Sequence, residues 1–115
     1  MDHKDLEVWK KSMDLVESIY TLTQRFPEAE KFGLTSQMRR SAVSIPSNIA
    51  EGAARKGDKE FLHFLYISLG SLSELETQYL IATRLEFIIK QESFEFQLLQ
   101  VKKLLLGFRN YLDKK

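Results

Sequence analysis

The residue pattern with the most recognisable chemistry is the Glu-x-x-His motif formed by Glu60 and His63. Carboxylate-bridged di-iron bundles use two such motifs on facing helices, together with two further glutamates. This sequence has one copy of the motif, and its only other histidine is His3. We therefore expect no metal site and no cofactor, and we expect His63 to be a partly exposed histidine on a helix.

Other residue types offer no catalytic arrangement. The chain has no cysteine, its glycines occur singly, and no serine, histidine and acid are spaced like a catalytic set. Glu51 is unusual because it lies in a stretch of small and apolar residues. It is either an unpaired acid or the ion partner of an arginine (Arg39, Arg40 or Arg55), and we favour the partner. We expect no catalytic residue and no enzymatic activity.

Basic side chains are the remaining candidates for chemistry, because guanidinium groups bind phosphate as well as carboxylate. Arg39 and Arg40 are adjacent, so they point in different directions from a helix. We predict that Arg39, Arg40, Arg55 and Lys56 bind nucleic acid, and the alternative is that they form salt bridges within the protein. On the first hypothesis, Arg39→Glu or Arg55→Glu weakens binding without unfolding the protein.

The net charge of +1 conceals alternating charge blocks. Residues 31–59 and 101–115 each carry a net charge of +4, whereas residues 1–30 carry −3 and residues 60–100 carry −4. Such blocks indicate acidic and basic faces that meet in an assembly or across a partner, or else ordinary solvated helix faces. A symmetric oligomer would repeat any basic patch around its axis.

The bulk composition is typical of one small soluble domain. The 115 residues suit a single domain, residues 1–115, with one core. The first residues are charged, which is unlike a signal peptide, and no apolar run approaches the roughly 18 residues that span a bilayer. We expect a cytoplasmic protein with no membrane partner.

Apolar residues recur at helical spacing almost everywhere, which predicts an all-α fold. We expect helices over about residues 5–26, 35–56, 58–85 and 93–112, with caps at Asp5, Thr35 or Ser36, Asp58 and Ser93. The first helix carries two adjacent apolar rows, namely Trp9, Met13, Val16 and Tyr20, and Leu15, Ile19, Leu22 and Phe26. Short connections favour an antiparallel up-down-up-down four-helix bundle.

The stretch SIPSNIAEGAARK places Pro46 inside the second helix. The apolar row stays in phase through the proline, so we predict one helix with a kink at Pro46; the alternative is two short helices. Proline gives no N–H to the Ala42 carbonyl, and in a helix interior it costs about 3 kcal/mol. Ser44, Ser47 or Asn48 is expected to supply another donor. Gly52 is expected to let another helix approach closely.

The third helix has apolar residues on nearly all of its faces. A single four-helix bundle does not easily cover so many apolar faces of one helix. We therefore predict a subunit interface along it, formed by Phe61, Phe64, Tyr66 and Ile67.

Three segments carry a family resemblance: DLEVWKKSMDLV, FPEAEKFGLTSQMRRSAVSIPSNIAEGAAR and EFLHFLYISLGSLSELETQYLIA. Across about residues 5–113 the chain resembles the four-helix bundle proteins encoded by intervening sequences of bacterial large-subunit ribosomal RNA genes. The resemblance implies an antiparallel bundle assembled into a ring-like homopentamer, with no established enzymatic activity.

Accessory proteins of diversity-generating retroelements are similar to this family and are thought to bind nucleic acid and a reverse transcriptase through a basic surface. The resemblance carries that role to Arg39, Arg40 and Arg55 at matching positions. Those relatives are strongly basic, whereas this chain is nearly neutral, which favours a ribosomal-insert or stand-alone role. Our leading hypothesis is a non-enzymatic homo-oligomer that binds structured RNA or DNA. The alternative is a scaffold that binds a protein partner and no nucleic acid.

Overall fold

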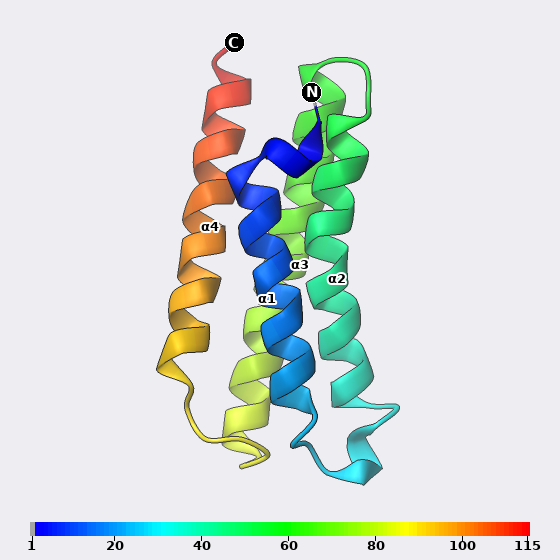
Figure 1. Ribbon diagram of the computed structural model, residues 1–115, viewed down its shortest axis with the longest axis vertical. Helices are drawn as coiled ribbons and strands as arrows, with labels where there is room; N and C mark the ends of the chain where they lie inside the picture. Colours follow the sequence, from blue (N-terminus) through cyan, green and yellow to red (C-terminus); the bar gives the residue numbers. More distant parts are fainter. Residues whose placement is uncertain (1) are drawn as a thin grey trace.

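Four α-helices make up most of the computed structural model, which describes residues 2–115 (Figure 1). Their bounds are Glu7–Thr23 for α1, Leu34–Ala53 for α2, Asp58–Arg84 for α3 and Glu92–Asp113 for α4, with short 3-10 helices η1 (His3–Asp5) and η2 (Glu28–Glu30). No strand occurs among residues 2–115. Each α-helix packs against two others, in the cyclic order α1, α2, α3, α4, so the four form a bundle. The predicted all-helical four-helix fold is confirmed.

The ends of the bundle carry different connections (Figure 1). The α1–α2 and α3–α4 connections lie at one end, and the α2–α3 connection and both chain termini lie at the other. None of the helices within residues 2–115 has the length and apolar character that crossing a bilayer requires.

Helix α2 continues without interruption through Pro46, which excludes the alternative of two short helices. The predicted bend at this position stays a prediction. The nearby donors mostly bond elsewhere: Asn48 donates its side-chain amide to the Ser44 carbonyl at 2.8 Å, and the Ser44 hydroxyl lies 2.8 Å from the Ser71 hydroxyl on α3. Ser68 of α3 donates to the Ile45 carbonyl at 3.0 Å. Hydroxyl groups therefore join α2 to α3 around the proline.

The predicted helix caps are wrong in detail. The cap positions are Leu6, Gly33, Gly57 and Gln91, and none of them makes a side-chain capping bond. At the start of α2 the Glu30 carboxylate accepts from the Leu34 N–H at 3.0 Å. Gly57 has a φ of 100°, a left-handed conformation that favours glycine, and it occupies the cap position that we predicted for Asp58.

One apolar row from each helix forms the core. In α1 only one of the two predicted rows is buried: Leu15 and Ile19 are fully buried, whereas Met13 and Tyr20 of the other row are 40% and 41% exposed. The broad stripe predicted for α1 thus has an inner row in the core and an outer row at the surface. At the close α2–α3 contact, a Cβ added to Gly52 would lie 2.8 Å from Phe61 Cδ1, which confirms the predicted close approach.

Candidate nucleic-acid interface

The four basic residues predicted to bind nucleic acid fall into two separate groups. Arg39 and Arg40 lie in the second turn of α2, and Arg55 and Lys56 follow its end. Because an α-helix rises about 1.5 Å per residue, the groups are separated by roughly 20 Å or more along the bundle. One duplex groove or one unpaired nucleotide therefore does not touch both groups on a single chain.

Arg39 is held between α1 and α2. Its Nε donates to Thr23 Oγ1 at 2.9 Å, and its guanidinium carbon lies 4.5 Å from the centre of the Tyr20 ring. Thr23 in turn donates to the Ile19 carbonyl at 2.7 Å. Arg39 is half-buried, whereas Arg40 is exposed. The Arg39 side chain is thus fixed by contacts within the chain, and Arg40 reaches solvent.

Arg55 lies beside an acid and an aromatic ring. Its Nη2 donates to Glu51 Oε1 at 3.0 Å, and its guanidinium carbon lies 5.1 Å from the centre of the Phe64 ring. This pair confirms the prediction that Glu51 partners an arginine. Because both side chains are about half exposed, the pair adds little to stability, and a phosphate can replace the carboxylate as partner. Lys56 is exposed beside it in the α2–α3 connection.

The last turns of α4 bring further cations to the same end. Lys115 Nζ lies 3.3 Å from Asp58 Oδ2, which joins the end of α4 to the start of α3 (Figure 1). We call this end, residues 51–60 and 109–115, the basic end. Its basic side chains are Arg55, Lys56, Lys59, Arg109, Lys114 and Lys115, and its acidic side chains are Glu51, Asp58, Glu60 and Asp113. The basic end therefore carries a surplus of two positive charges per chain.

An open hollow at the basic end contains the Glu-x-x-His motif. Its lining residues are Arg55, Lys59, Glu60, His63 and Phe64. His63 is exposed, and its ring centre lies 5.3 Å from that of Phe64. Within residues 2–115 no three side chains of the metal-binding types gather around a common point. The hollow presents two basic side chains, Arg55 and Lys59, together with the acid Glu60 and His63 around the Phe64 ring.

The four residues predicted to form a subunit interface are also divided. Phe61 is only 6% exposed and packs against Phe108 with ring centres 5.2 Å apart, so it belongs to the core of the bundle. Phe64 is half-buried. Tyr66 is 54% exposed and Ile67 is 38% exposed, so these two are the members that a second subunit can reach.

An apolar groove between α1 and α2 was not identified from the sequence. We call it the α1/α2 groove; its lining residues are Trp9, Met13, Val16, Val43, Pro46, Ser47 and Ala50. The outer row of α1 forms one wall, and the helix turns around Pro46 form the other. Six of the seven lining residues are apolar, whereas most exposed surface is mixed. The sequence signal was the second apolar row of the first helix, formed by Trp9, Met13, Val16 and Tyr20.

A second apolar surface lies between α3 and α4. Phe96 is 65% exposed, Leu80 is 53% exposed and Leu99 is 48% exposed, and all three line one hollow. A smaller hollow continues it along the bundle past Leu69 and Lys102. We call this surface the α3/α4 face. Large side chains exposed in a contiguous patch mark sites of interaction.

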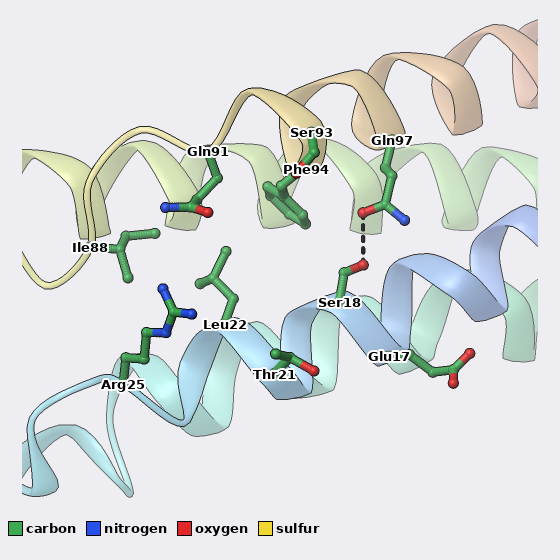
Figure 2. A pocket seen from close by; sticks show the side chains of 10 residues that line it. All are labelled: Glu17, Ser18, Thr21, Leu22, Arg25, Ile88, Gln91, Ser93, Phe94 and Gln97. Carbon is green, nitrogen blue, oxygen red and sulfur yellow. Dashed lines mark hydrogen bonds between the residues drawn. The ribbon is translucent and has the colours of Figure 1, made fainter.

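A third, more polar hollow separates α1 from α4 (Figure 2). Leu22 and Phe94 line it, and the Ser18 hydroxyl donates to Gln97 Oε1 at 2.7 Å across it. The Arg25 side chain points toward α4 (Figure 2). This hollow lies toward the end of the bundle opposite the basic end, so its arginine does not add to the basic end.

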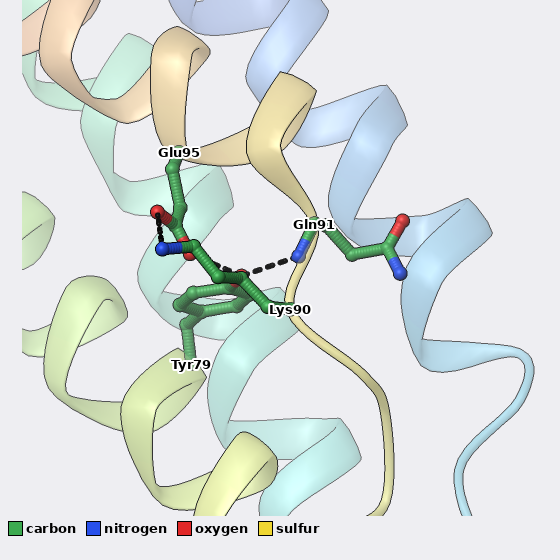
Figure 3. A network of polar contacts seen from close by, with 4 residues as sticks. All are labelled: Tyr79, Lys90, Gln91 and Glu95. Atoms are coloured by element: carbon green, nitrogen blue, oxygen red, sulfur yellow. Dashed lines mark hydrogen bonds and ion pairs between the residues drawn. The ribbon is translucent and has the colours of Figure 1, made fainter.

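A polar network fixes the α3–α4 connection (Figure 3). The Tyr79 hydroxyl donates to Glu95 Oε2 at 2.8 Å and accepts from the Gln91 N–H at 2.8 Å. Lys90 Nζ lies 3.6 Å from Glu95 Oε1. Burial, followed by the bond to Glu95, raises the pKa of Tyr79 above its usual value, although the Gln91 N–H opposes the shift. The network holds the start of α4 against α3.

Replacing Tyr79 by phenylalanine is expected to lower the free energy of unfolding by about 1–2 kcal/mol, because two hydrogen bonds are lost. Since the pKa of Tyr79 is raised in the folded state, the unfolded chain ionises first as pH rises above about 10, and stability falls from there upward. Urea denaturation between pH 7 and 11 should show a smaller alkaline decline in Tyr79→Phe. Tyr111→Phe, at a 59% exposed site, is the matched control. An unchanged alkaline decline in Tyr79→Phe would exclude Tyr79 as its source.

The geometry defines an all-helical protein of four packed helices, with a basic end and two apolar faces. A family model described as 23S rRNA-intervening sequence protein matches residues 4–107. The chain therefore belongs to this family, as the sequence resemblance predicted.

One solved structure gives an independent comparison. It is the crystal structure of a protein of unknown function from the S23 ribosomal protein family of Bacteroides thetaiotaomicron. That chain is 28% identical, the match covers 89% of this chain and 97% of that one, and the TM-score is 0.81. A search of curated proteins finds no match.

Proposed function

We propose that the protein is a non-enzymatic, cytoplasmic homo-oligomer that binds structured RNA or other nucleic acid through basic side chains. Arg55 and Lys56 are the principal contacts, and Lys59, Lys114 and Lys115 lie at the same end. The expected number of subunits is five, which rests on the family resemblance described above. The family description refers to 23S ribosomal RNA, and this makes structured RNA the first ligand to test.

The observation that carries the proposal is the basic end. Segments 51–60 and 109–115 are distant in sequence, yet the Asp58–Lys115 pair joins them at one end of the bundle. A surplus of two positive charges on one chain is small. A cyclic oligomer places every copy of this end on the same side of the ring, and the surplus is multiplied by the number of subunits. Many separate cations that contact phosphates bind nucleic acid electrostatically, so the affinity falls as the salt concentration rises.

Fluorescence anisotropy tests the proposal with a labelled RNA hairpin and a DNA duplex of matched length, each across a salt series. We expect binding that weakens as salt rises, with a slope of log K against log salt of about −0.9 per phosphate contacted in duplex DNA. An affinity that does not change with salt concentration, or no binding at low salt, would contradict phosphate contact.

Charge reversal at the basic end is the sharper test. The double variant Arg55→Glu/Lys56→Glu is expected to make the slope of log K against log salt shallower. The change is about two for each chain that contacts the nucleic acid, because two phosphate contacts are lost. Lys31→Glu makes the same kind of change in the exposed α1–α2 connection at the opposite end, and it should leave the slope unchanged. Arg40→Glu tests separately whether the other basic group contributes. If each single variant had half the effect of the double variant, in proportion to the charge changed, net charge and not the basic end would control binding.

The two apolar surfaces favour a second candidate function, a protein-interaction scaffold with no nucleic-acid binding. The α1/α2 groove and the α3/α4 face both present apolar side chains to solvent in one chain. On this alternative the arginines serve the bundle, as Arg39 does through Thr23. Absence of RNA and DNA binding at low salt, together with recovery of a specific protein partner, would support it.

A further inference from the structure

Two apolar surfaces on different helix pairs are unpartnered in the single chain. In the α1/α2 groove, Met13 and Val43 are each 40% exposed. On the α3/α4 face, Phe96 reaches 65%. Monomeric proteins seldom leave two such patches open to water, because each keeps apolar area hydrated.

The two surfaces lie on opposite sides of the bundle. Helix contacts occur between α1 and α2, α2 and α3, α3 and α4, and α1 and α4, but not between diagonal pairs within residues 2–115. This arrangement is a square, in which the α1–α2 edge is opposite the α3–α4 edge. A contact between the two surfaces is therefore heterologous: each copy presents one surface to the copy before it and the other to the copy after it.

Hydrogen bonds between helices fix which residues share a height along the bundle. The Ser18–Gln97 bond between α1 and α4 places Val16, two residues before Ser18, level with Leu99, two residues after Gln97. The Ser41–Glu74 bond, 3.1 Å long, and the Ser44–Ser71 bond show that numbering rises along α2 as it falls along α3. Arg39 is consequently level with Glu76, which lines the α3/α4 face.

These heights make the two surfaces complementary in copies that stand side by side at the same level. Val16 of one copy is then level with Leu99 of the next, and Val43 is level with Leu72, which lines the same hollow as Leu99, so that apolar groups cover apolar groups. Arg39 and Arg40 meet the side that carries Glu76. Within residues 2–115 none of these three charged residues has an ion pair, so each can take a partner from the neighbouring copy.

The bundle is also large enough for such a contact. Its extents are 45 × 25 × 20 Å, so one long side offers on the order of 900 Å². Stable interfaces between proteins bury about 800 Å² on each partner. A contact along the full side therefore has the size of a specific interface.

We propose that the occupant of the α1/α2 groove is a second copy of this chain, which inserts its α3/α4 face, with Arg39 and Arg40 of one copy facing Glu76 of the next. This inference rests on the oligomeric part of the proposed function and specifies its contact surfaces. It assigns the Trp9 row of α1 and the turns around Pro46 to the interface. It also gives Arg39 and Arg40 a role in assembly that is separate from the basic end.

Site-directed cross-linking tests the pairing directly, because the chain has no cysteine of its own. Val43→Cys and Leu99→Cys are prepared separately and together, and each is treated with a short bis-maleimide linker. We expect the double variant to give a ladder of covalent oligomers. We expect each single variant alone to remain largely uncross-linked, because a heterologous contact pairs each surface with a different surface of the neighbouring copy. Co-refolded single variants should give a cross-linked dimer as the main product.

Gln37→Cys paired with Leu99→Cys is the matched control. Gln37 is exposed and lies in one row with Ser41 and Ser44, on the side of α2 that faces α3 and away from the α1/α2 groove. This pair should not cross-link. Efficient self-linking of Val43→Cys would indicate a two-fold contact and overturn the proposal.

Sedimentation and RNA anisotropy on the unmodified chain separate this inference from the proposed function. If the chain sediments as an oligomer and binds RNA while the Val43–Leu99 pair does not cross-link, the assigned surfaces are wrong and the proposed function stands. A monomer at all concentrations would overturn the pairing and the oligomeric part of the function together. A ladder from the double variant with no RNA binding would support the pairing and contradict the nucleic-acid part.

Discussion

Replacing Leu65 by alanine is expected to lower the free energy of unfolding by about 3 kcal/mol, within the range of about 2–5 kcal/mol typical of buried leucines. Leu65 lies on α3 and is 0% exposed. Alanine is a strong helix former, so the helix itself is not weakened. The loss comes from the apolar atoms removed and from the cavity that remains among the rigid neighbours.

Urea denaturation followed by circular dichroism measures this effect, at several protein concentrations so that assembly is accounted for. The control is Leu85→Ala, the same substitution at the end of α3, where the side chain is 56% exposed. We expect the control to change stability by less than about 0.5 kcal/mol. Similar losses in both variants would show that burial along α3 is not as described.

The helices and most of the core could be predicted because apolar periodicity reports both. The row Leu34, Met38, Ala42, Ile45 and Ile49 stays in phase through Pro46, and the structure shows one helix with that row buried. Local turn geometry was harder to predict. Asp58 and Ser93 are good capping residues in isolation, yet Gly57 and Gln91 hold the cap positions because tertiary contacts and the left-handed Gly57 set where the helices begin.

The two apolar rows of α1 show the main limit of the sequence pattern. Each helix of a four-helix bundle has one inward face, so only one row can be buried by the chain itself. The spacing of apolar residues alone does not distinguish the Leu15 row, which lies in the core, from the Trp9 row, which forms one side of an open groove. That distinction depends on where α2 and α4 pack against α1. It is also why the α1/α2 groove was missed.

The candidate site was predictable residue by residue but not as a surface. Glu51 was predicted to partner Arg39, Arg40 or Arg55, and the structure shows that Arg55, four residues further along the chain, is the partner. The partnership of Asp58 with Lys115 spans the whole second half of the chain, and no local pattern indicates it. Likewise, Arg39 and Arg40 lie in the second turn of α2 whereas Arg55 and Lys56 follow its last turn, so the length of α2 separates the two pairs.

Gly52→Ala and Gly70→Ala are expected to shift stability in opposite directions. Alanine is favoured over glycine in a helix by about 0.5–1 kcal/mol, and this gain applies to both sites. At Gly70 nothing lies within 4 Å of the added Cβ, so the gain remains. At Gly52 the new Cβ would lie 2.8 Å from Phe61 Cδ1 and 2.9 Å from Phe64 Cβ.

Neither neighbour of Gly52 can move away easily. Phe64 Cβ is attached directly to the backbone of α3, and the Phe61 ring is fixed in the core against Phe108. Relief therefore requires α2 and α3 to separate, and overpacking of this kind costs about 1–3 kcal/mol. Because the helical gain applies to both sites, we expect Gly70→Ala to be more stable than Gly52→Ala by the overpacking cost of about 1–3 kcal/mol, with the unmodified chain between them. Equal midpoints of urea unfolding for Gly52→Ala and Gly70→Ala would show that α2 and α3 do not approach closely at Gly52. The physical reason for a glycine at this position would then be removed.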